Sequence, residues 1–190
     1  MSFFFTIESS MPLNPAALID EIGRPDVAIA QEATDDHGTV TFACLETPGA
    51  STRGVTVLSH PTHGIEIGVN AFATEDDAKL CLDAACALAE MTGQDIAAES
   101  GEVASAEALR DALPPTWVAE RGSEGEILLQ MARDEQGEPV TLIGCQHAYS
   151  VDRAYMEKLG PGLDDATLLH VLHRDCIALQ DLVRSEEILI

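Results

Sequence analysis

The chain has 190 residues, of which 46% are hydrophobic, enough for one globular domain with its own core. Its 33 acidic and 10 basic residues give a net charge of −23, which disfavours binding to nucleic acid or to an anionic membrane. The same charge attracts basic proteins. Solubility, or adaptation of the source organism to salt, explains the acidity equally well. We therefore expect either a basic protein partner or an acidity that serves solubility alone.

Short alternating segments dominate the first half of the chain. Residues 2–8 alternate between apolar and mixed positions, which predicts a strand. Asn14 and Pro15 then mark the start of a helix that should end at Gly23. Four further alternating segments follow at close spacing and cover 26–32, 38–46, 53–59 and 64–72. Strands joined by such short links favour an antiparallel meander.

A capped helix follows these strands. Thr74 and Asp77 form a capping box before an apolar run over 75–92, and Gly93 closes it. The remaining predicted segments are a strand at 95–99, a linker at 100–105, a helix at 104–113, a hairpin of strands 126–134 and 139–148, a helix near 151–159, and a last helix from 164 or 165 to about 183. The fold class is therefore predicted to be α+β, with a mainly antiparallel sheet and helices packed on one face. We expect a single domain over 1–190, with a division into lobes 1–100 and 105–190 left open.

The cysteines indicate a reducing compartment. They are odd in number and show no CxxC spacing, and they occupy Cys44, Cys81, Cys86, Cys145 and Cys176. The first residues lack the basic region of a signal peptide, and no apolar stretch is long enough to span a membrane. We expect a cytoplasmic protein without a cofactor, since no phosphate-binding, nucleophile-elbow or zinc-protease motif is present.

Three small groups of residues could carry chemistry. Cys145 and His147 lie two apart on a predicted strand and would share one face. A Cys–His pair can make a thiolate nucleophile, but residues so close on one strand rarely aim at each other, and burial of this face is the simpler interpretation. His60 and His63 would bracket a turn, where they could chelate a metal or be plain turn residues. Arg53 is expected to pair with neighbouring acids.

The last helix carries the segment LLHVLHRDC, which at first sight looks like a cluster of ligands. Helical phase divides it, because a core-facing apolar stripe runs through Leu169, Leu172, Cys176, Leu179 and Val183. His170 then faces outward and His173 lies on the flank, so the helix supplies two ligands where zinc needs three or four. We predict no metal here, with these two histidines as the only weak candidates. The outward face is instead a candidate partner-binding surface made of His170, His173, Arg174, Ile177 and Asp181.

One part of the chain resembles known proteins. The run STRGVTV, followed by GIEIGVNAFATEDDAKLCLDAACALAEMTGQDIAAE, resembles a group of uncharacterised bacterial cytosolic proteins. In its general character the chain is similar to immunity proteins of bacterial antagonism systems, such as those of type VI secretion. That resemblance implies a non-enzymatic protein that binds a cognate secreted toxin, here a basic one, and occludes it. Two alternatives stay open: a small metal-binding or Cys/His-dependent enzyme, and an accessory or adaptor protein of a secretion system.

Overall fold

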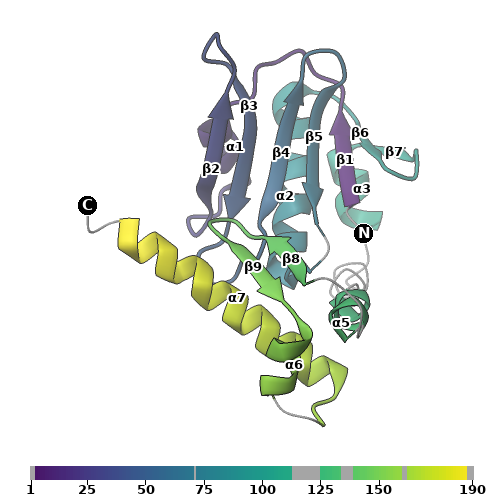
Figure 1. Cartoon of the computed structure of the whole chain (residues 1–190). Helices are drawn as coiled ribbons and strands as arrows, with labels where there is room; N and C mark the ends of the chain where they lie inside the picture. The colour runs from purple at the N-terminus through teal and green to yellow at the C-terminus, as the bar shows by residue number, and fades with distance from the viewer. Residues whose placement is uncertain (1–2, 71, 113–124, 134–138, 160–161, 188–190) are drawn as a thin grey trace.

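The computed structural model describes residues 3–70, 72–112, 125–133, 139–159 and 162–187; for 112, 125–128 and 183–187 it describes the backbone alone. Seven of the described strands form one antiparallel sheet in the order β2-β3-β4-β5-β1-β6-β7. They are β1 (Phe3–Ile7), β2 (Ala28–Thr34), β3 (Val40–Glu46), β4 (Val55–His60), β5 (Gly64–Val69), β6 (Ile96–Ala98) and β7 (Val103–Ala104). The helices α1 (Pro15–Ile22), α2 (Glu75–Thr92) and α3 (Ala106–Ala112) all lie behind the sheet in the view of Figure 1. The predicted α+β class is confirmed.

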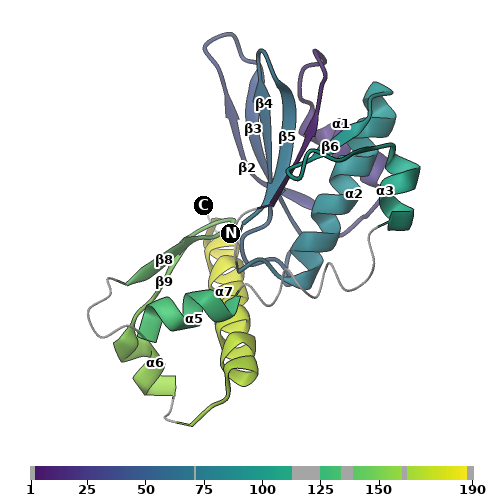
Figure 2. The same cartoon turned by 90° about the vertical axis from the view of Figure 1, so that its right-hand side faces the viewer.

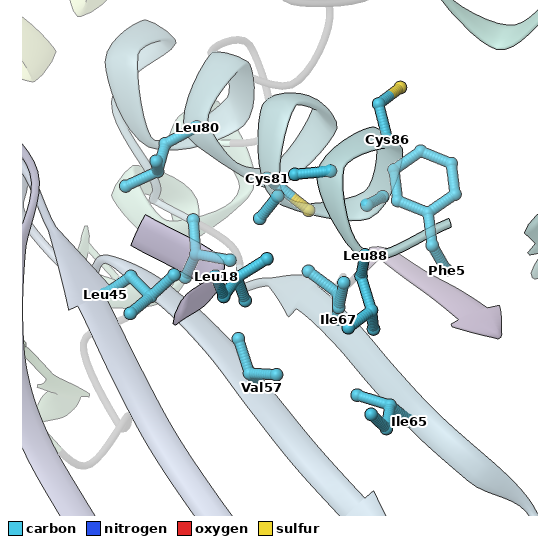
Figure 3. Packing of buried hydrophobic residues seen from close by; sticks show 14 of the residues in the cluster. Phe5, Leu18, Leu45, Val57, Ile65, Ile67, Leu80, Cys81, Cys86 and Leu88 are labelled. Atoms are coloured by element: carbon cyan, nitrogen blue, oxygen red, sulfur yellow. The ribbon is translucent and has the colours of Figure 1, made fainter. Parts of the chain in front are cut away.

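The central helix of this layer is α2, which begins and ends where the sequence predicts. Its buried side includes Cys81 and Ala84, which are small and let the helix lie close to the sheet. Figure 3 shows Cys81 and Leu88 on the side of α2 that faces the sheet, with Leu88 beside Ile67. The apolar run predicted over 75–92 therefore supplies the helix side of the main core.

The opposite face of the sheet is not covered by these helices, as Figure 2 shows. Successive side chains of a strand point to opposite faces. The core therefore receives Val55 and Val57 of β4, while Thr56 and Leu58 point the other way. We call this second side the uncovered face. One row of register partners crosses it from strand to strand, Phe42, Leu58, Glu66, Thr6 and Ala97.

The remaining described elements build a second hydrophobic core. They are α5 (Gly125–Arg133), β8 (Val140–Ile143), β9 (Ala148–Val151), α6 (Arg153–Leu159) and α7 (Asp165–Glu187). We call residues 3–112 the N-terminal lobe and residues 125–187 the C-terminal lobe. Ala106 and Leu109 of α3 belong to the first core, so the N-terminal lobe extends past residue 105. The N-terminal lobe also contributes Phe72 to the second core.

The hairpin predicted over 126–134 and 139–148 is wrong. Residues 125–133 form the helix α5, and the hairpin pairs β8 with β9 around a turn at 144–147. The alternation in EILLQMARD misled the prediction because it is short, while Glu, Leu, Gln, Met, Ala and Arg all favour helices. Leu129 and Ala132 are both buried at helical spacing, three residues apart.

The capping box of α2 reaches beyond its own helix. Asp77 is fully buried, and its Oδ2 atom accepts hydrogen bonds from the backbone N–H groups of Thr74 (3.0 Å), Thr52 (3.2 Å) and Arg53 (3.4 Å). The Thr74 hydroxyl in turn accepts from the N–H of Asp77 at 3.1 Å. One carboxylate thus joins the start of α2 to the segment that enters β4.

We predict that Asp77→Ala lowers the free energy of unfolding by about 2–4 kcal/mol, because it removes a cap and leaves buried N–H groups unsatisfied. Asp77→Asn keeps one acceptor oxygen and should lose less. The matched control is Glu75→Ala, at an exposed position in the same helical turn. Urea denaturation measures all three; an Asp77→Ala protein as stable as the Glu75→Ala protein would contradict the role given to this carboxylate.

Candidate functional site

The buried side of α7 is rotated slightly from the predicted stripe. Its buried described residues are Leu168, Leu172, Cys176 and Gln180, each four positions from the next. Leu169 and Leu179 are only partly buried and pack at the edge of the second core, while the side chain of Val183 lies outside the described residues. Leu172 and Cys176 face inward as predicted, and Gln180 is the residue that sequence reasoning missed.

The five predicted partner-binding residues on α7 do not form one outward surface. His170 and Arg174 are exposed, and the Arg174 guanidinium pairs with the neighbouring Asp175 at 2.8 Å. Ile177 is half-buried. His173 and Asp181 instead contact residues of the N-terminal lobe.

Those two contacts belong to the junction between the lobes. The His173 ring lies against the Phe72 ring, with 4.4 Å between centroids, and an Asp181 carboxylate oxygen accepts from the backbone N–H of Gly49 at 3.2 Å. Phe72 has a φ of +69°, which is rare for an aromatic residue, and its carbonyl accepts from the Thr52 hydroxyl at 2.8 Å. This backbone conformation accompanies a ring that sits in the core of the other lobe.

Gln180 holds the β8–β9 turn against α7. Its side-chain oxygen accepts from the backbone N–H groups of Gln146 (2.7 Å) and His147 (2.8 Å), and its side-chain nitrogen donates to the His147 carbonyl at 3.0 Å. The four-residue spacing from Leu168, Leu172 and Cys176 is the signal that could have placed position 180 on the buried side. Its polar character concealed it.

The same turn meets the N-terminal lobe. The Gln146 side chain donates to Glu46 Oε1 at 3.1 Å, and Arg53 Nε donates to the Ile143 carbonyl at 2.9 Å. A Cβ atom placed on Gly54 would lie 2.9 Å from the Cys145 sulfur and 3.1 Å from the Cys44 sulfur. The two thiols, one from each lobe, therefore pack where residue 54 has no side chain.

The prediction that Cys145 and His147 share one face of a strand is wrong. Both residues lie in the turn and not on a strand, and Cys145 is buried whereas His147 is exposed. A hydrogen bond with the Cys44 thiol and burial raise the pKa of Cys145 far above its usual value. Its thiol therefore stays protonated, contrary to what a nucleophile requires.

His60 and His63 bracket the link between β4 and β5, as predicted: His60 is the last residue of β4, His63 lies in the turn, and their ring centroids are 6.5 Å apart. The Thr62 hydroxyl is 2.6 Å from His63 Nδ1. His63 lines a pocket of about 490 Å³ together with Thr6, Glu8, Ser9, Ser10, Pro61, Thr62, Gly64 and Ala97. Across the described residues, no three or more His, Cys, Asp or Glu side chains come together as a metal site would need, and this includes His170 and His173.

The uncovered face is a candidate binding surface that the sequence analysis did not predict. Phe42 and Leu58 are half-buried apolar residues on it, and Glu66 lies in the same row. The basic residues of the N-terminal lobe lie elsewhere: Arg24, Lys79 and Arg110 with the helices, and Arg53 at the junction. The sequence does not reveal this surface, because strand order and register decide which residues share it.

No protein-family model, no curated protein and no solved structure matches the chain. Within the described residues, no helix has both the length and the apolar character needed to cross a membrane.

We predict that His173 makes stability depend on pH. Burial lowers the pKa of His173 below its usual 6.5; Asp77 opposes the shift and His170 adds to it. The unfolded chain therefore takes up a proton that the folded protein resists, so the free energy of unfolding should fall as the pH drops from about 7.5 to 5.5.

His173→Phe should flatten this slope, since a phenyl ring can still pack on Phe72 without titrating. The exposed His170→Gln serves as control and should keep the slope. Urea denaturation at several pH values provides the measurement, and an unchanged slope in the His173→Phe protein would refute the assignment.

Proposed function

We propose that this protein binds a basic protein and blocks it by occlusion, in the manner of a bacterial immunity protein that neutralises a secreted toxin. The observation that carries the proposal is the way the structure uses its few cations. The net charge of −23 acts on a partner through the carboxylates that no cation neutralises, and the placement of the cations decides which carboxylates these are.

Most of the described arginines are engaged within the molecule. Arg24 pairs with Asp26 at 2.9 Å and with Asp76 at 3.2 Å. Four others form the ion pairs Arg110–Glu90, Arg133–Asp165, Arg153–Glu157 and Arg174–Asp175. Each pair neutralises its cation locally, so the excess of carboxylates dominates the field that an approaching molecule meets.

Such a field selects partners by sign. It repels nucleic acid and draws a basic protein toward the surface, which raises the association rate more than it raises the affinity. Occlusion requires only that the bound protein cover the active site of its partner. The proposal therefore needs an exposed surface with apolar anchors, and the uncovered face offers Phe42 and Leu58.

The test begins with the protein encoded beside this one in its genome. Expressed alone in bacterial cytoplasm, that neighbour should slow growth, and co-expression of the present chain should restore it. We predict that the association rate of the two purified proteins falls at least about tenfold between roughly 50 and 500 mM salt, because screening weakens electrostatic attraction.

Stopped-flow fluorescence or surface plasmon resonance measures this rate. Repeating the measurement in an uncharged osmolyte of equal osmolality controls for effects other than screening. A rate indifferent to salt would remove the electrostatic basis of the proposal, and the absence of any binding would remove the proposal itself.

A further inference from the structure

Two exposed surfaces meet where the lobes join. One is the uncovered face, and the other is the outer side of the β8–β9 hairpin. We propose that the basic partner docks across both at once, with Phe42, Leu58 and Ile143 as apolar anchors and Glu66 as an anionic contact. This inference rests on the proposed function and adds the surface that performs it.

The uncovered face carries large apolar residues among polar ones such as Thr6, Thr56 and Glu66, whereas the solvated side of an antiparallel sheet normally carries polar residues. Phe42 and Leu58 are direct register partners on β3 and β4. Phe4 lies in the neighbouring row, where its ring occupies the space that a side chain at Gly68 would fill. Apolar residues therefore extend over several strands of this face, interrupted by Glu66.

The hairpin contributes its outer side. Leu142 and Tyr149 pack into the second core, so the alternating partners Thr141 and Ile143 point away from the helices of the C-terminal lobe. Ile143 is 70% exposed, although isoleucine is among the residues most often buried. Figure 2 shows the hairpin extending from the base of the sheet on the side of the uncovered face, with α5 and α6 on its far side.

The junction holds these two surfaces at a set angle. Arg53 Nε donates to the carbonyl of Ile143 itself, and the Gln146 side chain donates to Glu46 at the end of β3. Gln180 fixes the turn between them. A surface ordered before binding loses little conformational entropy when a partner docks.

Charge identifies the kind of partner. The uncovered face carries Glu66, and the Arg and Lys residues of the N-terminal lobe lie with the helix layer or, as Arg53, are half-buried at the junction. The pocket of about 490 Å³ adjoins the row, because Thr6 and Ala97 belong to both. Glu8, Ser9 and Ser10 line it together with His63, and the carboxylate of Glu8 can accept hydrogen bonds from a lysine or arginine side chain.

The experiment uses the protein encoded by the neighbouring gene as probe and measures its dissociation constant. Ile143→Arg and Leu58→Arg place a cation on each surface, and each should weaken binding at least about 30-fold. Ile143→Glu removes the same apolar contact but adds an attractive charge, so it should weaken binding much less than Ile143→Arg. Ala178→Arg is the matched control on the exposed side of α7 and should change the constant less than about threefold.

Thermal unfolding and circular dichroism of each variant separate lost binding from lost folding, and the high exposure of Ile143 makes that variant the safer one. A probe that binds the wild type and is weakened only by Ala178→Arg would overturn the surface and leave the proposed function standing. A wild-type dimer in light scattering that Leu58→Arg dissociates would show that a second copy occupies the face, which also overturns the proposal. A probe that binds no version of the chain would overturn both inferences together.

Discussion

The buried Asp77 carboxylate is the interaction on which the arrangement of the lobes depends. It caps α2 and also receives the backbone N–H groups of Thr52 and Arg53. That fixed segment then serves the second lobe, because the Thr52 carbonyl accepts from the N–H of Cys145 at 3.4 Å and the Thr52 hydroxyl holds Phe72. Asp77 therefore does more than cap its own helix, because it also fixes the segment that contacts the C-terminal lobe.

The junction also explains why only part of the sheet is uncovered. Cys44 and Glu46 alternate with the core residues of β3 and so share the side of Phe42. Both are buried, and the turn at 144–147 lies over them, with Cys145 against Cys44 and Gln146 bonded to Glu46. The C-terminal lobe therefore covers one end of this face and leaves the row from Phe42 to Ala97 open.

Local signals predicted the first half of the chain well. The helix α2 was located to the residue because Thr74, Asp77 and Gly93 act within single turns, and the strands before it followed from alternation. The segment 125–133 failed because eight or nine residues of mixed pattern satisfy both periods. The partner-binding surface predicted on α7 included His173 on the flank and Asp181 outward, whereas their neighbours across the junction come from positions 72 and 49. Contacts over such separations depend on how the lobes pack, and no local pattern encodes them.

The packing of Cys44 against Cys145 has one more consequence. All five cysteines are buried as free thiols, and these two belong to different lobes. An alkylating reagent can reach Cys44 and Cys145 only when the lobes separate or the protein unfolds. Cys81 lies on the side of α2 that packs on the sheet, so it stays covered until the N-terminal lobe itself opens. The order in which the thiols are alkylated therefore distinguishes separation of the lobes from unfolding of the N-terminal lobe. Alkylation of Cys44 and Cys145 before Cys81 would report that the lobes separate while the N-terminal lobe stays folded.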